Sequence, residues 1–218
     1  MNAILLQLPL QGALQVRKSP ATRVPSHGTH LFALAHSIDL VPLDEHGHGA
    51  RYQLRSFFRS QAPEIFPGFG RAVLAPLSGE VVSAQDGLPD HLAHRGLPSI
   101  AYALTQARRA AGGFETLAGN HLIIRRSGDS TGHPADSSGE IFLALCHLRQ
   151  GSIQVSPGQW VKTGQKVAEC GNSGNSTEPH LHLQLMDAAD PEKAQGVAFT
   201  FPGGLPRNGA IITAGPAP

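Results

Sequence analysis

The sequence predicts an all-β (β-rich) protein: an antiparallel β-sheet sandwich with a groove active site and one short helix in an insertion. Three observations predict this fold class. The 218 residues include 25 glycines and 17 prolines, which disfavours a helical bundle because both residues are costly inside helices. Apolar residues make up 40% and charged residues only 15%, which excludes an intrinsically disordered chain. Short apolar runs bounded by Gly/Pro turns are typical of strands.

The expected elements follow from these runs in chain order. They are two short strands around Gly12 within residues 1–24, a histidine-rich loop at 25–30, an apolar strand ending at 37–41, an elaborated loop at 44–70, a strand–turn–strand unit at 73–82, one helix from Ser99 to Ala111, strands at 120–126 and 140–148 around a polar hairpin loop at 127–134, several short strands up to Met186, and an aperiodic tail except at 209–213. We expect a single domain over 1–218, with its core at about 24–186, N-terminal strands at 1–23 and a C-terminal extension at 187–218.

The charge balance excludes some classes of partner. Seventeen basic and sixteen acidic residues leave a formal charge of +1 without a basic stripe, which argues against a nucleic-acid partner. The apolar N-terminus is interrupted by Pro9 and Gly12, well short of a membrane span, and has no basic region of an export signal. Two cysteines cannot form a disulfide framework in a chain of this length, so we expect two buried thiols.

The segment from Glu178 to Met186 carries the sharpest pattern in the chain. Because successive strand side chains point to opposite faces, His180, His182 and Gln184 share one face, and the alternating leucines share the other. Two imidazoles at this spacing can share a metal ion, or one can bind it while its neighbour moves protons. A half-buried strand with two surface histidines is the alternative.

Asp39 lies within an otherwise apolar strand, where a carboxylate is costly unless it is paired or bound to a metal. His27, His30 and His36 precede it. A catalytic zinc site needs three protein ligands and an open position, so Asp39, one of these histidines and His182 could form one. His147, at the end of another apolar strand, is by itself more typical of a structural residue.

With these residues in place, the sequence resembles the M23 family of lysostaphin-type zinc metallopeptidases. The resemblance is strongest over residues 141–186 and extends more weakly to 37–39, 75–82 and 119–120. Its motifs are Leu145-Cys146-His147-Leu148, Gly171-Asn172-Ser173-Gly174 and Pro179-His180-Leu181-His182.

The resemblance implies one Zn²⁺ in an antiparallel sheet groove and hydrolysis of peptide bonds in bacterial cell-wall (peptidoglycan) peptides, in an extracytoplasmic setting. It implies that Asp39 and His182 bind the metal and that His147 and His180 are the catalytic imidazoles. The family's His-x-x-x-Asp pattern is absent here, because Ala35 stands four residues before Asp39. We therefore expect His30 as the remaining ligand, with His36 second and His27 third.

Two other classes compete with the peptidase. An M23-like module that has lost its ligand set could bind a cell-wall peptide or a protein partner, and the altered His/Asp spacing supports it. A biotinyl- or lipoyl-type carrier domain shares the Val/Gly hairpin pattern, but Lys162 and Lys166 lie inside a strand–turn stretch and not alone at a hairpin tip.

Overall fold

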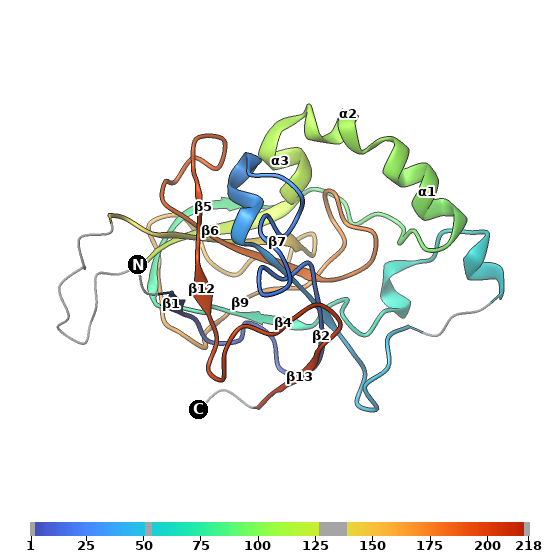
Figure 1. The fold of residues 1–218 in the computed structure, drawn as a ribbon, viewed down its shortest axis with the longest axis horizontal. Helices are drawn as coiled ribbons and strands as arrows, with labels where there is room; N and C mark the ends of the chain where they lie inside the picture. Colours follow the sequence, from blue (N-terminus) through green and yellow to red (C-terminus); the bar gives the residue numbers. More distant parts are fainter. Residues whose placement is uncertain (1–2, 51–53, 127–138, 216–218) are drawn as a thin grey trace.

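The computed structural model describes residues 3–50, 54–126 and 139–215 (Figure 1). The predicted hairpin loop at 127–134 therefore lies outside the described residues. Within the described ranges, the sheets are antiparallel except for one short parallel pair. The predicted β-rich, antiparallel class is thus confirmed. In the part of the chain that the structure describes, no helix combines the length and apolar character needed to cross a membrane.

The strands have the following bounds: β1 Ile4–Leu5, β2 Gly12–Arg17, β3 Ile38–Pro42, β4 Ala72–Leu74, β5 Gly79–Gln85, β6 Asn120–Arg126, β7 Phe142–Leu148, β8 Trp160–Val161, β9 Lys166–Glu169, β10 Leu181–Met186, β11 Gly196–Val197, β12 Phe199–Thr200 and β13 Ile211–Ala214. The helices are α1 Leu97–Leu104, α2 Gln106–Ala110 and α3 Gly113–Ala118, and the 3-10 segments are η1 Leu31–His36, η2 Leu54–Phe57 and η3 Pro63–Ile65.

The main sheet places distant parts of the chain side by side. Its strand order is β13-β2-β3-β10-β7-β6-β5-β8, and β11 also pairs with β10. β10 therefore lies between β3, from the first fifth of the chain, and β7. Two short pairs, β1–β12 and β4–β9, complete the strand set of the described residues. This order brings the strands that carry Asp39, His147 and His182 together at the centre of the sheet.

The two faces of the main sheet have different roles. Leu181, Leu183 and Leu185 of β10 are fully buried in the larger apolar core, together with Val73 of β4 and Val167 of β9. Each buried leucine of this kind stabilises the fold by about 1.5–3 kcal/mol. The opposite face carries a smaller core under η1 and α3. Figure 1 shows the three helices on one side of the main sheet and β4 and β9 on the other.

Two sequence predictions about local structure were wrong. The single helix expected from Ser99 to Ala111 is broken at Thr105, whose hydroxyl donates to the Tyr102 carbonyl (2.9 Å) and whose backbone leaves helical geometry. Such local side-chain bonds compete with helix propagation. The apolar run before Asp39 forms η1 and not a strand, because Phe32 and Ala33 adopt left-handed φ values of 56° and 61°.

Candidate metal centre and active site

Asp39 and His182 face each other across the β3–β10 ladder. They are direct register partners in this antiparallel pair, so their side chains lie on the same face of the sheet. His182 Nδ1 lies 2.9 Å from Asp39 Oδ1, and both residues are only 6% exposed. The strand register therefore builds this pair directly.

His27 is the third member of the group. Its Nε2 lies 3.1 Å from Asp39 Oδ1, and one ligand atom each from His27, Asp39 and His182 lie within 4.8 Å of one another. Its Nδ1 lies 2.7 Å from the hydroxyl of Ser37. Because Ser37 stands two residues before Asp39 in extended chain, the two side chains share one face. Ser37 thus holds His27 beside the carboxylate.

His30, which the sequence analysis placed in the ligand set, lies outside this group. Its side chain is exposed, and it immediately precedes η1. His36 also lies outside; burial and the nearby charge of His30 lower its pKa. The choice of His30 assumed that its loop folds back over the start of a strand, but residues 31–36 form η1 with two left-handed residues. The structure instead brings His27, the third-ranked candidate, to Asp39.

Hydrogen bonds fix which nitrogen of His27 and of His182 carries the proton. Ser37 Oγ donates to the Leu34 carbonyl (2.8 Å), so it accepts the proton of His27 Nδ1–H. Gln184 Nε2 donates to the Phe32 carbonyl (2.8 Å), so Gln184 Oε1 accepts the proton of His182 Nε2–H at 3.0 Å. Both imidazoles therefore direct an unprotonated nitrogen towards Asp39.

Three electron-pair donors thus converge on one point without a proton between them. A carboxylate and two imidazole lone pairs repel one another unless a cation lies among them. Ligand atoms on one tetrahedral Zn²⁺ are separated by about 3.3 Å, close to the 2.9 and 3.1 Å found here. The donor set fits a zinc ion.

His147 reaches the same site through a β-bulge. Opposite His121 of β6, strand β7 carries two residues, Cys146 and His147, as the register shifts between Asn120 and Leu122. In a regular strand His147 would point into the larger core with Leu145. Its left-handed φ of 63° turns the imidazole to the other face, at a cost of about 1–3 kcal/mol. Strict alternation could not have predicted this orientation.

His180 lies beside His147, with ring centroids 4.8 Å apart, and its Nε2 is 3.7 Å from Asp39 Oδ1. His180 Nδ1 donates to the Glu178 carbonyl (2.8 Å), and His147 Nδ1 donates to the Ser173 carbonyl (2.9 Å). Each imidazole therefore keeps an unprotonated Nε2. Burial is the main cause that lowers the pKa of both groups, so both are neutral near pH 7.

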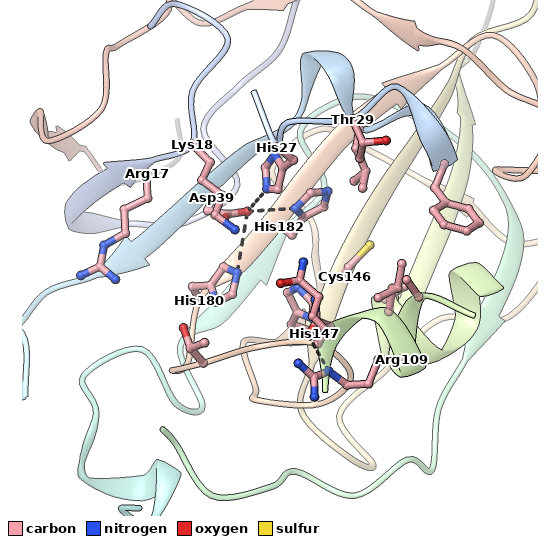
Figure 2. Close-up of a pocket in the computed structure, with 18 of the residues that line it drawn as sticks. Arg17, Lys18, His27, Thr29, Asp39, Arg109, Cys146, His147, His180 and His182 are labelled. Atoms are coloured by element: carbon pink, nitrogen blue, oxygen red, sulfur yellow. Dashed lines mark hydrogen bonds and ion pairs between the residues drawn. The ribbon is translucent and has the colours of Figure 1, made fainter. Parts of the chain in front are cut away.

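A cavity of about 320 Å³ opens onto these groups. Figure 2 shows His27, Asp39, His182, His180 and His147 clustered at its centre. The helical insertion 97–118 supplies much of one wall. Residues 173–176 bond both to the insertion and to His147 and His180. The cavity is large enough for part of an extended peptide.

The structure thus brings four of the five residues chosen from the sequence, namely Asp39, His147, His180 and His182, around one cavity, and leaves out His30. Their chemical roles remain predictions. Sequence reasoning missed Ser37 and Gln184, which orient the imidazoles of His27 and His182. The two-residue spacing of a strand could have identified Gln184, because it places this residue on the same face as His180 and His182. The same spacing places Ser37 on the face of Asp39.

The architecture and donor set define a β-rich protein with a His/Asp/His group of the kind that holds a metal ion. Residues 110–194 match the model of Peptidase family M23. This segment contains His147, His180 and His182, so the resemblance to family M23 is confirmed there.

Solved structures give more distant matches. The catalytic domain of the antimicrobial peptidase lysostaphin from Staphylococcus simulans is 23% identical, with a TM-score of 0.35, covering 59% of this chain and 68% of that one. A zinc containing peptidase from Vibrio cholerae is 22% identical, with a TM-score of 0.35, covering 60% of this chain and 27% of that one. The M23 metalloprotease pseudoalterin, described as from the deep sea, is 14% identical, with a TM-score of 0.41, covering 90% and 76%. The chain therefore spans about a quarter of the Vibrio cholerae peptidase.

Proposed function

We propose that this protein is a zinc-dependent endopeptidase that hydrolyses peptide bonds in bacterial cell-wall peptides, with Zn²⁺ held by His27, Asp39 and His182. The convergence of two unprotonated imidazole nitrogens and one carboxylate on a single point beside an open cavity carries the proposal. The cell-wall substrate and its extracytoplasmic setting come from the resemblance to family M23. Bound at this position, Zn²⁺ supplies Lewis acidity to the scissile carbonyl and lowers the pKa of water.

The two remaining imidazoles supply proton transfer. Each holds its Nδ1–H on a backbone carbonyl and presents an unprotonated Nε2. One of them can accept the proton of the attacking water at Nε2 and later donate it to the leaving nitrogen, while Nδ1–H stays in place. Because both imidazoles have the same tautomer, either His147 or His180 can be this base.

Zinc stoichiometry tests the ligand set. We expect one zinc per chain in the wild-type protein and in His30→Ala, and less than 0.1 zinc per chain in His27→Ala after dialysis, measured by elemental mass spectrometry. His30→Ala is the matched control, because the residue lies in the same loop outside the group. Zinc retained by His27→Ala and lost by His30→Ala would show that the ligand assignment is wrong.

Digestion of purified muropeptides, read by mass spectrometry, tests the activity. We expect zinc-dependent appearance of cleaved stem or bridge peptides, abolished by a chelator. Protein that binds zinc and muropeptides without cleaving them would instead favour the binding module, a degenerate relative of the peptidase.

A further inference from the structure

Arg109, in α2 of the helical insertion, has an unusual environment for a cation. Its guanidinium stacks over the ring of Tyr102 at 3.6 Å. It donates from Nε to Asn175 Oδ1 (2.7 Å), from Nη1 to Thr105 Oγ1 (2.5 Å) and from Nη2 to the Tyr102 carbonyl (2.7 Å). All these partners are neutral. Across residues 3–50, 54–126 and 139–215, Arg109 has no carboxylate partner.

These contacts hold the guanidinium in one position without using all of its donors. An arginine has five N–H groups, and three are bound to the protein. The stacking on Tyr102 and the three acceptors remove most of the side chain's freedom, so little entropy remains to be lost when an anion binds. Arg109 is therefore preorganised and still carries its charge.

Arg109 lies near the proposed catalytic imidazoles. It lines the same cavity, and its partner Asn175 stands two residues from Ser173, whose carbonyl holds His147. Two residues of chain span at most about 7 Å. Figure 2 shows Arg109 on the His147 side of the group, away from His27. A group bound by Arg109 would thus lie in the same cavity, on the His147 side of the reacting bond.

Further hydrogen bonds hold the helical insertion 97–118 against residues 173–175. Tyr102 donates its hydroxyl proton to the Gly174 carbonyl (3.0 Å), and the backbone N–H of Asn175 donates to the Leu117 carbonyl (2.8 Å). Gly119 and Gly174 approach so closely that a Cβ on Gly174 would lie 2.4 Å from Gly119 N. The position of Arg109 relative to His147 is therefore set by packing as well as by its own bonds.

The acidic residues that line the cavity do not neutralise Arg109. Glu178 forms ion pairs with Arg17 and Arg95. Asp39 belongs to the ligand group. The wall formed by the insertion thus presents a fixed, uncompensated positive charge to the cavity.

We propose that Arg109 binds a carboxylate group of the peptide substrate and makes the cavity selective for acidic peptides. This inference rests on the proposed function, because the peptide is taken to occupy the cavity next to the imidazoles. Guanidinium and carboxylate form charge-assisted hydrogen bonds, which are about twice as strong as neutral ones. Arg109 is a specificity-determining residue, and it takes no part in the bond cleavage.

Paired peptides test this inference. Fluorescent hexapeptides of glycine and alanine carry one Glu, or the uncharged isostere Gln, at each position in turn. With zinc-loaded wild-type protein, we expect kcat/KM for the best Glu peptide to exceed that of its Gln partner by about tenfold. Arg109→Gln should reduce this ratio to about one. Arg108→Gln is the matched control: Arg108 is exposed and does not line the cavity, so the ratio should stay at about ten.

The Glu/Gln ratio of kcat/KM distinguishes carboxylate recognition by Arg109 from a purely structural role. If Arg109 only anchored the insertion, Arg109→Gln would slow cleavage of both peptides equally and leave the wild-type preference unchanged, which would overturn the inference. Arg109→Lys retains the charge without the planar fork and should keep part of the preference. Equal cleavage of Glu and Gln peptides by the wild-type protein would also overturn it, with the proposed function intact.

Failure of the proposed function gives a different result. If no peptide is cleaved, the same peptides are compared by equilibrium binding. A tenfold preference for the Glu peptide that disappears in Arg109→Gln would then support the carboxylate site without the peptidase activity. Equal binding of both peptides, or no binding of either at millimolar concentration, would refute the site.

Discussion

Replacing Gln184 with leucine tests how the ligand imidazole is oriented. The fully buried Gln184 accepts the proton of His182 Nε2–H and donates to the Phe32 carbonyl. Leucine is similar in size and removes both bonds without a large cavity. His182 can then move its proton to Nδ1, where it forms a hydrogen bond to Asp39 and blocks the nitrogen that would bind the metal.

Gln184→Leu should weaken zinc binding and also destabilise the metal-free protein, and both effects have expected magnitudes. Zinc binding must restore the less favourable tautomer, so zinc affinity should fall 10–100-fold, about 1.4–2.7 kcal/mol. The Phe32 carbonyl loses its partner, which lowers the free energy of unfolding of the metal-free protein by about 1–3 kcal/mol. For a chain of this size, each kcal/mol corresponds to about 2–4 °C in Tm.

Chelator competition measures the zinc Kd, and thermal unfolding of the metal-free protein measures the second effect. Gln184→Glu keeps an acceptor for His182 Nε2–H and should stay within about threefold of the wild-type Kd. Gln154→Leu, at an exposed glutamine that does not line the cavity, is the matched control. A zinc Kd of Gln184→Leu within twofold of wild type would refute the tautomer argument.

Three further predictions follow from the site and its packing. In the metal-free protein, burial is the main cause that lowers the pKa of His27, His147 and His180 below 6.5, so the unfolded chain binds more protons and stability should fall as the pH drops below 6.5; a Tm that stays constant between pH 7.5 and 5.5 would contradict this. His147→Ala should retain one zinc per chain and lose about 10²–10⁴-fold in kcat on muropeptides; loss of the zinc would instead indicate that His147 is a ligand. Gly174→Ala requires a left-handed φ of 70° and meets the Gly119 backbone, so we expect a loss of more than about 1 kcal/mol in urea unfolding, whereas Gly158→Ala, also left-handed but in open space, should lose less.

The sequence predicted the features that depend on local pattern. Alternation along residues 178–186 placed His180, His182 and Gln184 on one face, and the isolated carboxylate of Asp39 indicated a paired or metal-bound group. The antiparallel register then makes Asp39 and His182 partners. The shared face required only strand periodicity, and the prediction for Asp39 required only the cost of burying a charge. The register that pairs Asp39 with His182 comes from the fold.

The features that the sequence did not predict depend on tertiary contacts. His27 is held by Ser37, ten residues away, across a 3-10 segment with two left-handed residues, and no fixed spacing encodes that arrangement. The orientation of His147 depends on a bulge against β6. The break at Thr105 rests on one local hydroxyl bond, which helix propensity alone does not reveal.

The central position of β10 between β3 and β7 has a consequence during synthesis of the protein. The three proposed ligands come from residues 27, 39 and 182, so about 140 residues separate the second from the third. A nascent chain that has not yet emerged beyond residue 182 cannot enclose the metal, however well its first strands have folded. The proposed metal site can therefore form only after residue 182 has emerged and β10 has paired with β3.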